Sequence, residues 1–150
     1  MTARERLNTV LRGGIPDHVP VSPDTSNMIP ARMTGKSLID IYLYEEIPLW
    51  RAYLDCVKYF GFDALMDGSL PVWFDDLDAG TLEQQEYIIS ESPDRVITRR
   101  ARSAAGKLFW NDSVRIYTSE NPPVNRDYRL LGLDESPISW KKVEKRSSYP

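Results

Sequence analysis

The first 60 residues carry apolar side chains at the three- and four-residue spacing of amphipathic helices. Thr2 and Glu5 are spaced as a capping box, in which two side chains satisfy free backbone N–H groups of the first helical turn. A helix is therefore predicted over 3–13, with Gly13 favouring its end. Three further helical pieces are predicted between positions 26 and 60, the clearest being 46–60. The predicted apolar faces are Leu7, Val10 and Leu11 in the first helix, and Trp50, Tyr53, Leu54, Val57 and Phe60 in the last.

Other parts of the chain have the shorter period of β-structure. Residues 18–23 alternate prolines with apolar residues, which predicts a strand-like edge segment because proline cannot donate to a sheet. The apolar run 62–66 is bounded by glycines and is predicted to be a buried strand. Beyond residue 78, short β-prone runs separated by turn-forming residues predict an antiparallel meander. The runs are 87–89, 96–98, 107–110 and 114–118, and the predicted turns are 92–94, 104–106 and 111–113.

These elements predict an α+β chain with N-terminal helices, one buried strand and an antiparallel β-meander. A single parallel strand needs neighbours on both edges, so the chain is expected to open a larger structure. We predict leader helices and a first strand in 1–78, the meander in 79–135, and a connector or incomplete helix in 136–150.

Composition narrows the classes of function. The chain has 150 residues, of which 41% are hydrophobic, and a net charge of -3 that gives no general attraction to nucleic acid or anionic membranes. No apolar run approaches the ~20 residues of a membrane span, and no secretory signal is seen, so a cytoplasmic location is expected. Cys56 is the only cysteine and His18 the only histidine, which excludes an internal disulfide and a zinc site made of Cys and His alone.

Few side chains suggest chemistry by themselves. Asp67 and Ser69 follow the predicted strand at the end where α/β folds place substrate contacts, so they are candidate ligands for a substrate. His18 is expected to hydrogen-bond locally, and Cys56 to be a small core residue. Four arginines lie on one predicted strand, and nearby acidic residues favour cross-strand ion pairs over an anion site. These arginines are Arg95, Arg99, Arg100 and Arg102, and the acidic residues are Glu83, Glu86, Glu91 and Asp94.

The opening of the chain carries the clearest family likeness. Residues 2–6, followed by the stretch Leu11-Arg12-Gly13-Gly14-Ile15-Pro16-Asp17-His18-Val19-Pro20-Val21, resemble the start of the uroporphyrinogen decarboxylase-like superfamily. Residues 59–64 are similar to that family's helix leading into its first strand. Residues 98–108 are similar to a hairpin of its methyltransferase-like members. The resemblance implies a (β/α)8 TIM barrel, of which this chain would be the N-terminal portion.

Departures from the decarboxylase pattern favour the methyltransferase branch. The arginine positions with which decarboxylases grip substrate carboxylates fall on Thr25 and Ile29, and the decarboxylase aspartate falls at Leu70. The resemblance thus implies corrinoid-dependent methyl transfer from a small methylated compound, with a corrinoid protein as partner. Zinc would be bound by later His and Cys residues, so no metal or cofactor is expected in this chain, which would be inactive alone.

The same resemblance implies a substrate pocket. Asp24 and Asn27, after the proline-rich segment, would line it together with Asp67 and Ser69. Two alternatives stay open: a free-standing, non-catalytic interaction module, and a uroporphyrinogen decarboxylase of tetrapyrrole synthesis. Strand edges left unpaired in a truncated barrel would also predict a homo-oligomer.

Overall fold

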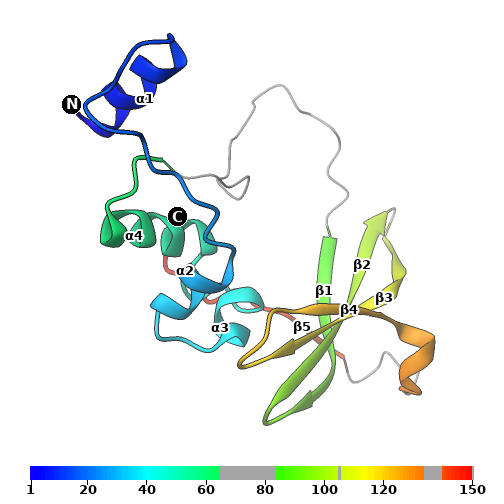
Figure 1. Ribbon diagram of the computed structural model, residues 1–150. Coiled ribbons are helices and arrows are strands. Elements are labelled where there is room, and N and C mark those ends of the chain that lie inside the picture. Colours follow the sequence, from blue (N-terminus) through cyan, green and yellow to red (C-terminus); the bar gives the residue numbers. More distant parts are fainter. Residues whose placement is uncertain (65–83, 105, 134–139, 150) are drawn as a thin grey trace. The chain divides into compact units, whose positions relative to one another are not determined.

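The computed structural model describes residues 1–64, 84–104, 106–133 and 140–149 (Figure 1). They form two compact units. The first comprises 1–35 and the described part of 47–72, and the second comprises 36–46 and the described part of 73–150. Among these residues, every helix is too short or too polar to span a lipid bilayer.

The first unit begins with the predicted N-terminal helix, α1 (Ala3–Leu11). The Thr2 hydroxyl accepts a hydrogen bond from the Glu5 amide at 3.2 Å, and the Glu5 carboxylate accepts one from the Thr2 amide at 2.7 Å. The capping box is therefore confirmed. The helix ends at Leu11, before the predicted limit at residue 13, and Gly13 has a φ of +74°, in the left-handed region that favours glycine.

The buried side of α1 differs from the prediction. Val10 and Leu11 are 42% and 82% exposed, whereas Arg6 is 7% exposed. The apolar face predicted for this helix is thus wrong at Val10 and Leu11 within the described residues. A charged side chain is buried instead, because carboxylates from distant parts of the chain surround it.

Two more helices complete the first unit. α2 (Met28–Met33) packs against α4 (Leu49–Phe60). α4 begins three residues later than predicted, since Pro48 biases the residue before it away from helical conformation. Its buried side chains are Ala52, Tyr53 and Cys56, so the core position of Cys56 is confirmed while Phe60 is half exposed.

The second unit contains a five-stranded sheet in which every pair of strands is antiparallel. The strand order is β4-β3-β2-β1-β5. The strands are β1 (Gln84–Ser92), β2 (Arg95–Ala104), β3 (Lys107–Thr118), β4 (Val124–Asp127) and β5 (Lys141–Lys142). The meander is confirmed, but the turn predicted at 111–113 is wrong. Those residues bulge within β3, because Arg99 pairs with Val114 and Ala101 already pairs with Trp110.

This sheet overturns the expected architecture. The prediction that the chain opens a (β/α)8 barrel is wrong, since the described strands form an antiparallel sheet without a parallel pair. Of the predicted strand 62–66, residues 62–64 form no strand and 65–66 lie outside the described residues. The physical reason is local. From β1 to β4, short connections let each strand pair with its neighbour in sequence, and no crossover helix is needed.

Each face of the sheet has its own apolar cluster. α3 (Leu38–Tyr42) covers one face, where Ile39 and Leu43 pack with Val96 and Tyr117 (Figure 1). On the other face, Ile97 and Val114 pack with Tyr128 of η1 (Tyr128–Leu131) and with Trp140. Val96 and Ile97 are adjacent in β2 and point to opposite faces, as strand alternation requires.

The segment expected to be a connector also belongs to this unit. Its residues 141–142 form β5, the edge strand beside β1. Farther along, the Arg146 amide donates to the Tyr44 carbonyl at 2.7 Å, and the Arg146 guanidinium lies 3.6 Å from the centre of the Tyr44 ring. Arg146 therefore contacts Tyr44, and Val143 packs against the apolar cluster on the face that α3 covers, whereas Trp140 lies on the other face.

Candidate functional site

The four residues predicted to line a substrate pocket have different positions. Asp67 and Ser69 lie outside the described residues. Asp24 accepts a hydrogen bond from the Ser26 amide at 2.8 Å, which makes a local turn. Asn27 accepts a hydrogen bond from the Tyr53 hydroxyl at 2.6 Å, so α4 fixes its amide group. The structure thus ties Asn27 to the unit's core and leaves Asp24 in a local turn.

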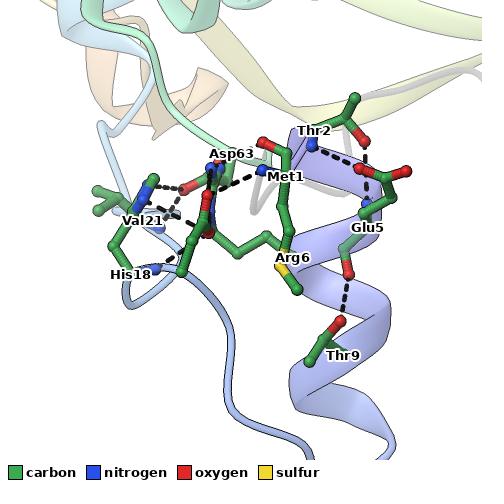
Figure 2. A network of polar contacts seen from close by, with 9 residues as sticks. Met1, Thr2, Glu5, Arg6, Thr9, His18, Val21 and Asp63 are labelled. Carbon is green, nitrogen blue, oxygen red and sulfur yellow. Dashed lines mark hydrogen bonds and ion pairs between the residues drawn. The ribbon is translucent and has the colours of Figure 1, made fainter.

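The best-developed polar cluster of the first unit surrounds Arg6 (Figure 2). Arg6 Nε donates to Asp17 Oδ1 at 2.7 Å and Nη2 donates to Asp17 Oδ2 at 3.0 Å, a bidentate pair. Nη1 donates to Asp63 Oδ1, and Nη2 also donates to the Met1 carbonyl at 3.0 Å. One guanidinium therefore joins α1, the segment after it and the residues that follow α4. We call Arg6, Asp17 and Asp63 the Arg6 network.

Asp63 extends this network to the proline-rich segment. Its Oδ2 accepts a hydrogen bond from the Val21 amide at 2.8 Å, and its own amide donates to the Val21 carbonyl at 2.8 Å. Residues 18–23 form no strand, contrary to the prediction, yet Val21 is paired on both backbone groups. The His18 amide donates to Asp17 Oδ1 at 3.0 Å, as the expected local hydrogen bond, and its ring is 57% exposed.

Electrostatics keep both carboxylates of the network ionised. Hydrogen bonds from Arg6 hold the pKa of Asp17 far below its ordinary value. The amide of Val21 lowers the pKa of Asp63, with a further contribution from Arg6 that opposes the effect of desolvation. The two carboxylates in turn raise the pKa of Arg6, and Asp17 makes the largest contribution. Groups held in one charge state near neutral pH suit anchoring rather than general acid–base catalysis.

The network predicts acid sensitivity of the first unit. Both carboxylates have folded pKa values below the ordinary 3.8, so they stabilise the unit above that value and lose this contribution as the pH falls through their lowered pKa values. Urea denaturation from pH 6 to pH 2 is expected to show little change down to about pH 5 and a decline below about pH 4. Asp63→Asn is expected to be less stable at pH 6 and to decline less steeply. An equally steep decline in this variant would contradict the assignment.

The segment held by the network has unusual features of its own. The Ser22 hydroxyl is buried and has no hydrogen-bond partner within the described residues. Ser26 has a φ of +48°, a conformation that non-glycine residues adopt at a cost in free energy and that recurs at functional sites. Thr25 hydrogen-bonds to Cys56, whose thiol pKa is raised by burial. Residues 22–27 therefore form the candidate site of the first unit.

A second polar cluster is built on the sheet. Glu86 Oε2 accepts a hydrogen bond from Arg100 Nε at 3.0 Å, which confirms the predicted cross-strand ion pairing for this arginine. Glu86 Oε1 accepts hydrogen bonds from the Tyr117 hydroxyl at 2.8 Å and from the Thr98 hydroxyl. These four residues, which we call the Glu86 cluster, lie on the face that α3 covers.

Burial and hydrogen bonding act in opposite directions on Glu86. Burial raises its pKa, but the hydroxyls of Thr98 and Tyr117 and the charge of Arg100 outweigh burial and leave the pKa below its ordinary value. Burial and the adjacent carboxylate raise the pKa of Tyr117 to about 12, so its hydroxyl remains a donor at neutral pH. The cluster is thus an ion pair with two fixed hydroxyl donors.

The Tyr42 hydroxyl, near this cluster, is buried without a hydrogen-bond partner within the described residues. Since no hydrogen bond is lost, Tyr42→Phe is expected to leave the free energy of unfolding unchanged or to raise it by up to ~1 kcal/mol. Tyr117→Phe is the matched control, because it removes a donor from Glu86 and is expected to cost about 1–2 kcal/mol. Urea denaturation measures both. A loss in Tyr42→Phe as large as in the control would show that its hydroxyl is satisfied.

Sequence reasoning missed the central residue of the first cluster. Arg6 lies in the family-like opening, but the sequence indicates no role for it, because a lone arginine on a helix is ordinarily a surface residue. Asp17 and Asp63 also lie in the family-like stretches. The sequence does contain one indication of the network. Its arginine and its two aspartates all lie in short stretches that resemble the same protein family.

Comparison with protein-family models, with curated proteins and with solved structures gave no match. Within the described ranges, no three His, Cys, Asp or Glu side chains are grouped to hold a metal ion.

Proposed function

We propose that the chain belongs to a protein of the uroporphyrinogen decarboxylase-like superfamily, on its corrinoid-linked methyltransferase branch, that takes a methyl group from a small methylated compound. The proposal concerns the activity and not a barrel architecture. Its main support is the Arg6 network. Three of the four family-like stretches, 2–6, 11–21 and 59–64, each contribute one residue to it, although Arg6 and Asp63 are 57 positions apart.

The described residues would position a substrate-facing segment. Val21 is fixed by Asp63 on one side of residues 22–27, and Asn27 is fixed by Tyr53 on the other. Between these anchors lie the unpartnered Ser22 hydroxyl and the Asp24 carboxylate. Such polar groups on an anchored segment suit hydrogen bonding to the polar part of a small methyl donor.

The zinc ion and corrinoid that the resemblance implies do not fit the described residues. The Cys56 thiol is fully buried with a raised pKa, and the His18 ring is turned toward Asp17 and Asp63. We therefore assign neither group to any residue of the two described units. The decarboxylase alternative lacks support at Thr25. A decarboxylase would need an arginine there to bind a substrate carboxylate, whereas Thr25 is uncharged and hydrogen-bonds to Cys56.

The test is an activity screen of the full-length gene product. Small compounds with N-, O- or S-methyl groups are incubated with the protein in the presence and absence of a corrinoid, and demethylated product is measured by chromatography. Corrinoid-dependent demethylation of at least one compound is expected. Decarboxylation of uroporphyrinogen, or no demethylation of any compound, would contradict the proposal.

Variants connect such an activity to the candidate site. Asn27→Ala is expected to raise the KM for the methyl donor, because the proposal assigns the Asn27 amide to the substrate-binding segment. Tyr53→Phe is the matched control, since it removes only the hydroxyl that fixes Asn27 and is expected to have the smaller effect. Equal effects would give Asn27 a structural role alone.

One observation favours the alternative of an interaction module. β4 pairs only with residues 113–116 of β3, so residues 107–112 have no strand on their outer edge within the described residues, and Phe109 there is 58% exposed. Such an edge can pair with a second copy of the chain. Light scattering would then detect a dimer that Phe109→Lys dissociates and the control Leu130→Lys does not. A monodisperse wild-type monomer would remove this alternative.

A further inference from the structure

The face of the sheet opposite α3 carries a row of side chains that runs across neighbouring strands. The register places Lys142 of β5 beside Tyr87 of β1, and Tyr87 beside Arg99 of β2. Arg99 pairs in turn with Val114 of β3, which belongs to the apolar cluster on this face. Residues that pair directly in an antiparallel sheet share a face. Two cations, Lys142 and Arg99, therefore stand on either side of Tyr87.

Three aromatic rings gather beside this row. The ring centres of Tyr87 and Trp110 are 5.1 Å apart, and those of Trp110 and Trp140 are 4.9 Å apart, both in edge-to-face arrangement. An edge-to-face contact occupies a face of only one of its two rings. All three residues are partly exposed, so the rings offer planar surface to a partner. We call Lys142, Tyr87, Arg99, Trp110 and Trp140 the Tyr87 face.

The two cations of the Tyr87 face have no carboxylate partner. Neither Lys142 nor Arg99 forms an ion pair within the part of the chain that the structure describes. The Arg99 guanidinium donates through Nε to a backbone carbonyl at 2.7 Å and lies 5.9 Å from the centre of the Trp110 ring. Glu86 and Glu91 of β1 lie on the face that α3 covers, because they pair with Arg100 and Val96.

Rings and unpaired cations on one surface indicate a partner that is both planar and anionic. Proteins that bind single-stranded nucleic acid without sequence preference combine aromatic side chains, on which bases stack, with cations beside the phosphates. An acidic peptide would use the cations and not the rings, and a proline-rich peptide would use the rings and not the cations. The Tyr87 face therefore suits a single strand of nucleic acid better than either peptide.

We propose that the Tyr87 face binds single-stranded nucleic acid, with bases against the aromatic rings and phosphates beside Lys142 and Arg99. The net charge of -3 gives the rest of the chain no general attraction to phosphates, so binding is confined to this face. All of these residues belong to the second unit. The proposal is thus independent of residues 22–27 and of the proposed methyl transfer.

The test titrates the full-length protein into a fluorescein-labelled oligothymidylate of ten nucleotides and measures fluorescence anisotropy. Two phosphate contacts predict that the Kd rises about sevenfold when the salt concentration is raised from about 50 to about 200 mM. A peptide of ten glutamates is the competitor that carries charge without rings, and it is expected to displace the oligonucleotide poorly. Absence of binding, or displacement by this peptide as effective as by unlabelled oligonucleotide, would overturn the proposal.

Two lysine variants locate the phosphate contact. Lys142→Gln removes one of the two contacts, so its Kd is expected to rise only about threefold over the same range of salt. Lys141→Gln is the matched control. Lys141 is the exposed neighbour in β5, and it pairs with Ile88, which packs against the cluster on the α3 face. Its removal changes the net charge equally and should leave the sevenfold rise intact. Equal salt dependence in the two variants would contradict the proposed face.

Substitutions of Tyr87 test the stacking. Tyr87→Leu removes the ring and is expected to raise the Kd at least about fivefold without changing its salt dependence. Tyr87→Phe keeps the ring and loses only the hydroxyl, which donates to Gln85 at 2.6 Å, so it is expected to bind as the wild type does. Circular dichroism checks that both variants are folded. An unchanged Kd in Tyr87→Leu would show that charge alone holds the strand and would overturn the proposal.

Discussion

Arg6→Ala is expected to lower the melting temperature of the first unit by roughly 10 °C or more. The Arg6 side chain is 9% exposed and that of Asp63 is 5% exposed, so the substitution leaves a carboxylate shielded from water without its counter-charge. It also removes the bidentate pair with Asp17. The change further releases α1, whose other contacts are few. Thermal denaturation followed by circular dichroism measures the shift, and hydrogen exchange assigns it to the residues of the first unit.

Arg4→Ala is the control for that experiment. Arg4 lies one half-turn away on α1 and is exposed, so losing its charge is expected to change the melting temperature very little. A comparable shift in Arg4→Ala would mean that helix propensity or net charge, and not the Arg6 network, stabilises this part of the molecule.

Glu86→Ala is expected to reduce the free energy of unfolding of the second unit by about 2–4 kcal/mol. The carboxylate is 18% exposed and accepts three hydrogen bonds, from Thr98, Tyr117 and Arg100. Thr98 and Tyr117 are themselves 0% and 1% exposed, so their hydroxyls would be left without an acceptor and without water. Urea denaturation of the variant and the wild type measures the difference.

Glu91→Ala tests whether the loss belongs to the cluster. Glu91 is an exposed residue of the same strand, and its removal is expected to change stability by less than about 0.5 kcal/mol. The pKa of Glu86 is lowered on folding, so its contribution is present above its ordinary pKa of 4.5 and is lost as the pH falls below that value. The difference between wild type and Glu86→Ala should therefore shrink in acid. A difference that stays constant down to pH 3 would contradict this account.

Elements that depend on neighbouring residues were predicted well. The capping box lies within the four consecutive residues from Thr2 to Glu5, and the hairpins of the meander need only turn residues between β-prone runs. The turn predicted at 111–113 failed because a bulge uses the same polar residues as a turn, and only the partner strand distinguishes them. The barrel failed because strand direction is a property of the whole sheet.

In the candidate sites, too, contacts that follow from local strand pairing were predicted, and contacts that need several distant segments were not. Arg100 was expected to pair with an acidic residue across the strands, and strand alternation was enough to suggest it. The Glu86 cluster as a whole was not foreseen, because it brings together residues of three strands. The pocket role of Asp24 and Asn27 stays a prediction, which the variants of Asn27 address.

The sequence by itself determined that the first 60 residues form helices, that β-prone runs follow beyond residue 78, and that Cys56 is a core residue. These properties depend on side-chain size, polarity and spacing within a few residues. Only the tertiary structure decided that Arg6 is buried between Asp17 and Asp63, and that Glu86 accepts hydrogen bonds from residues of two other strands. The physical reason is that ion pairing and burial depend on distance in space, and chain closure brings together groups whose separation in the sequence carries no signal of their contact.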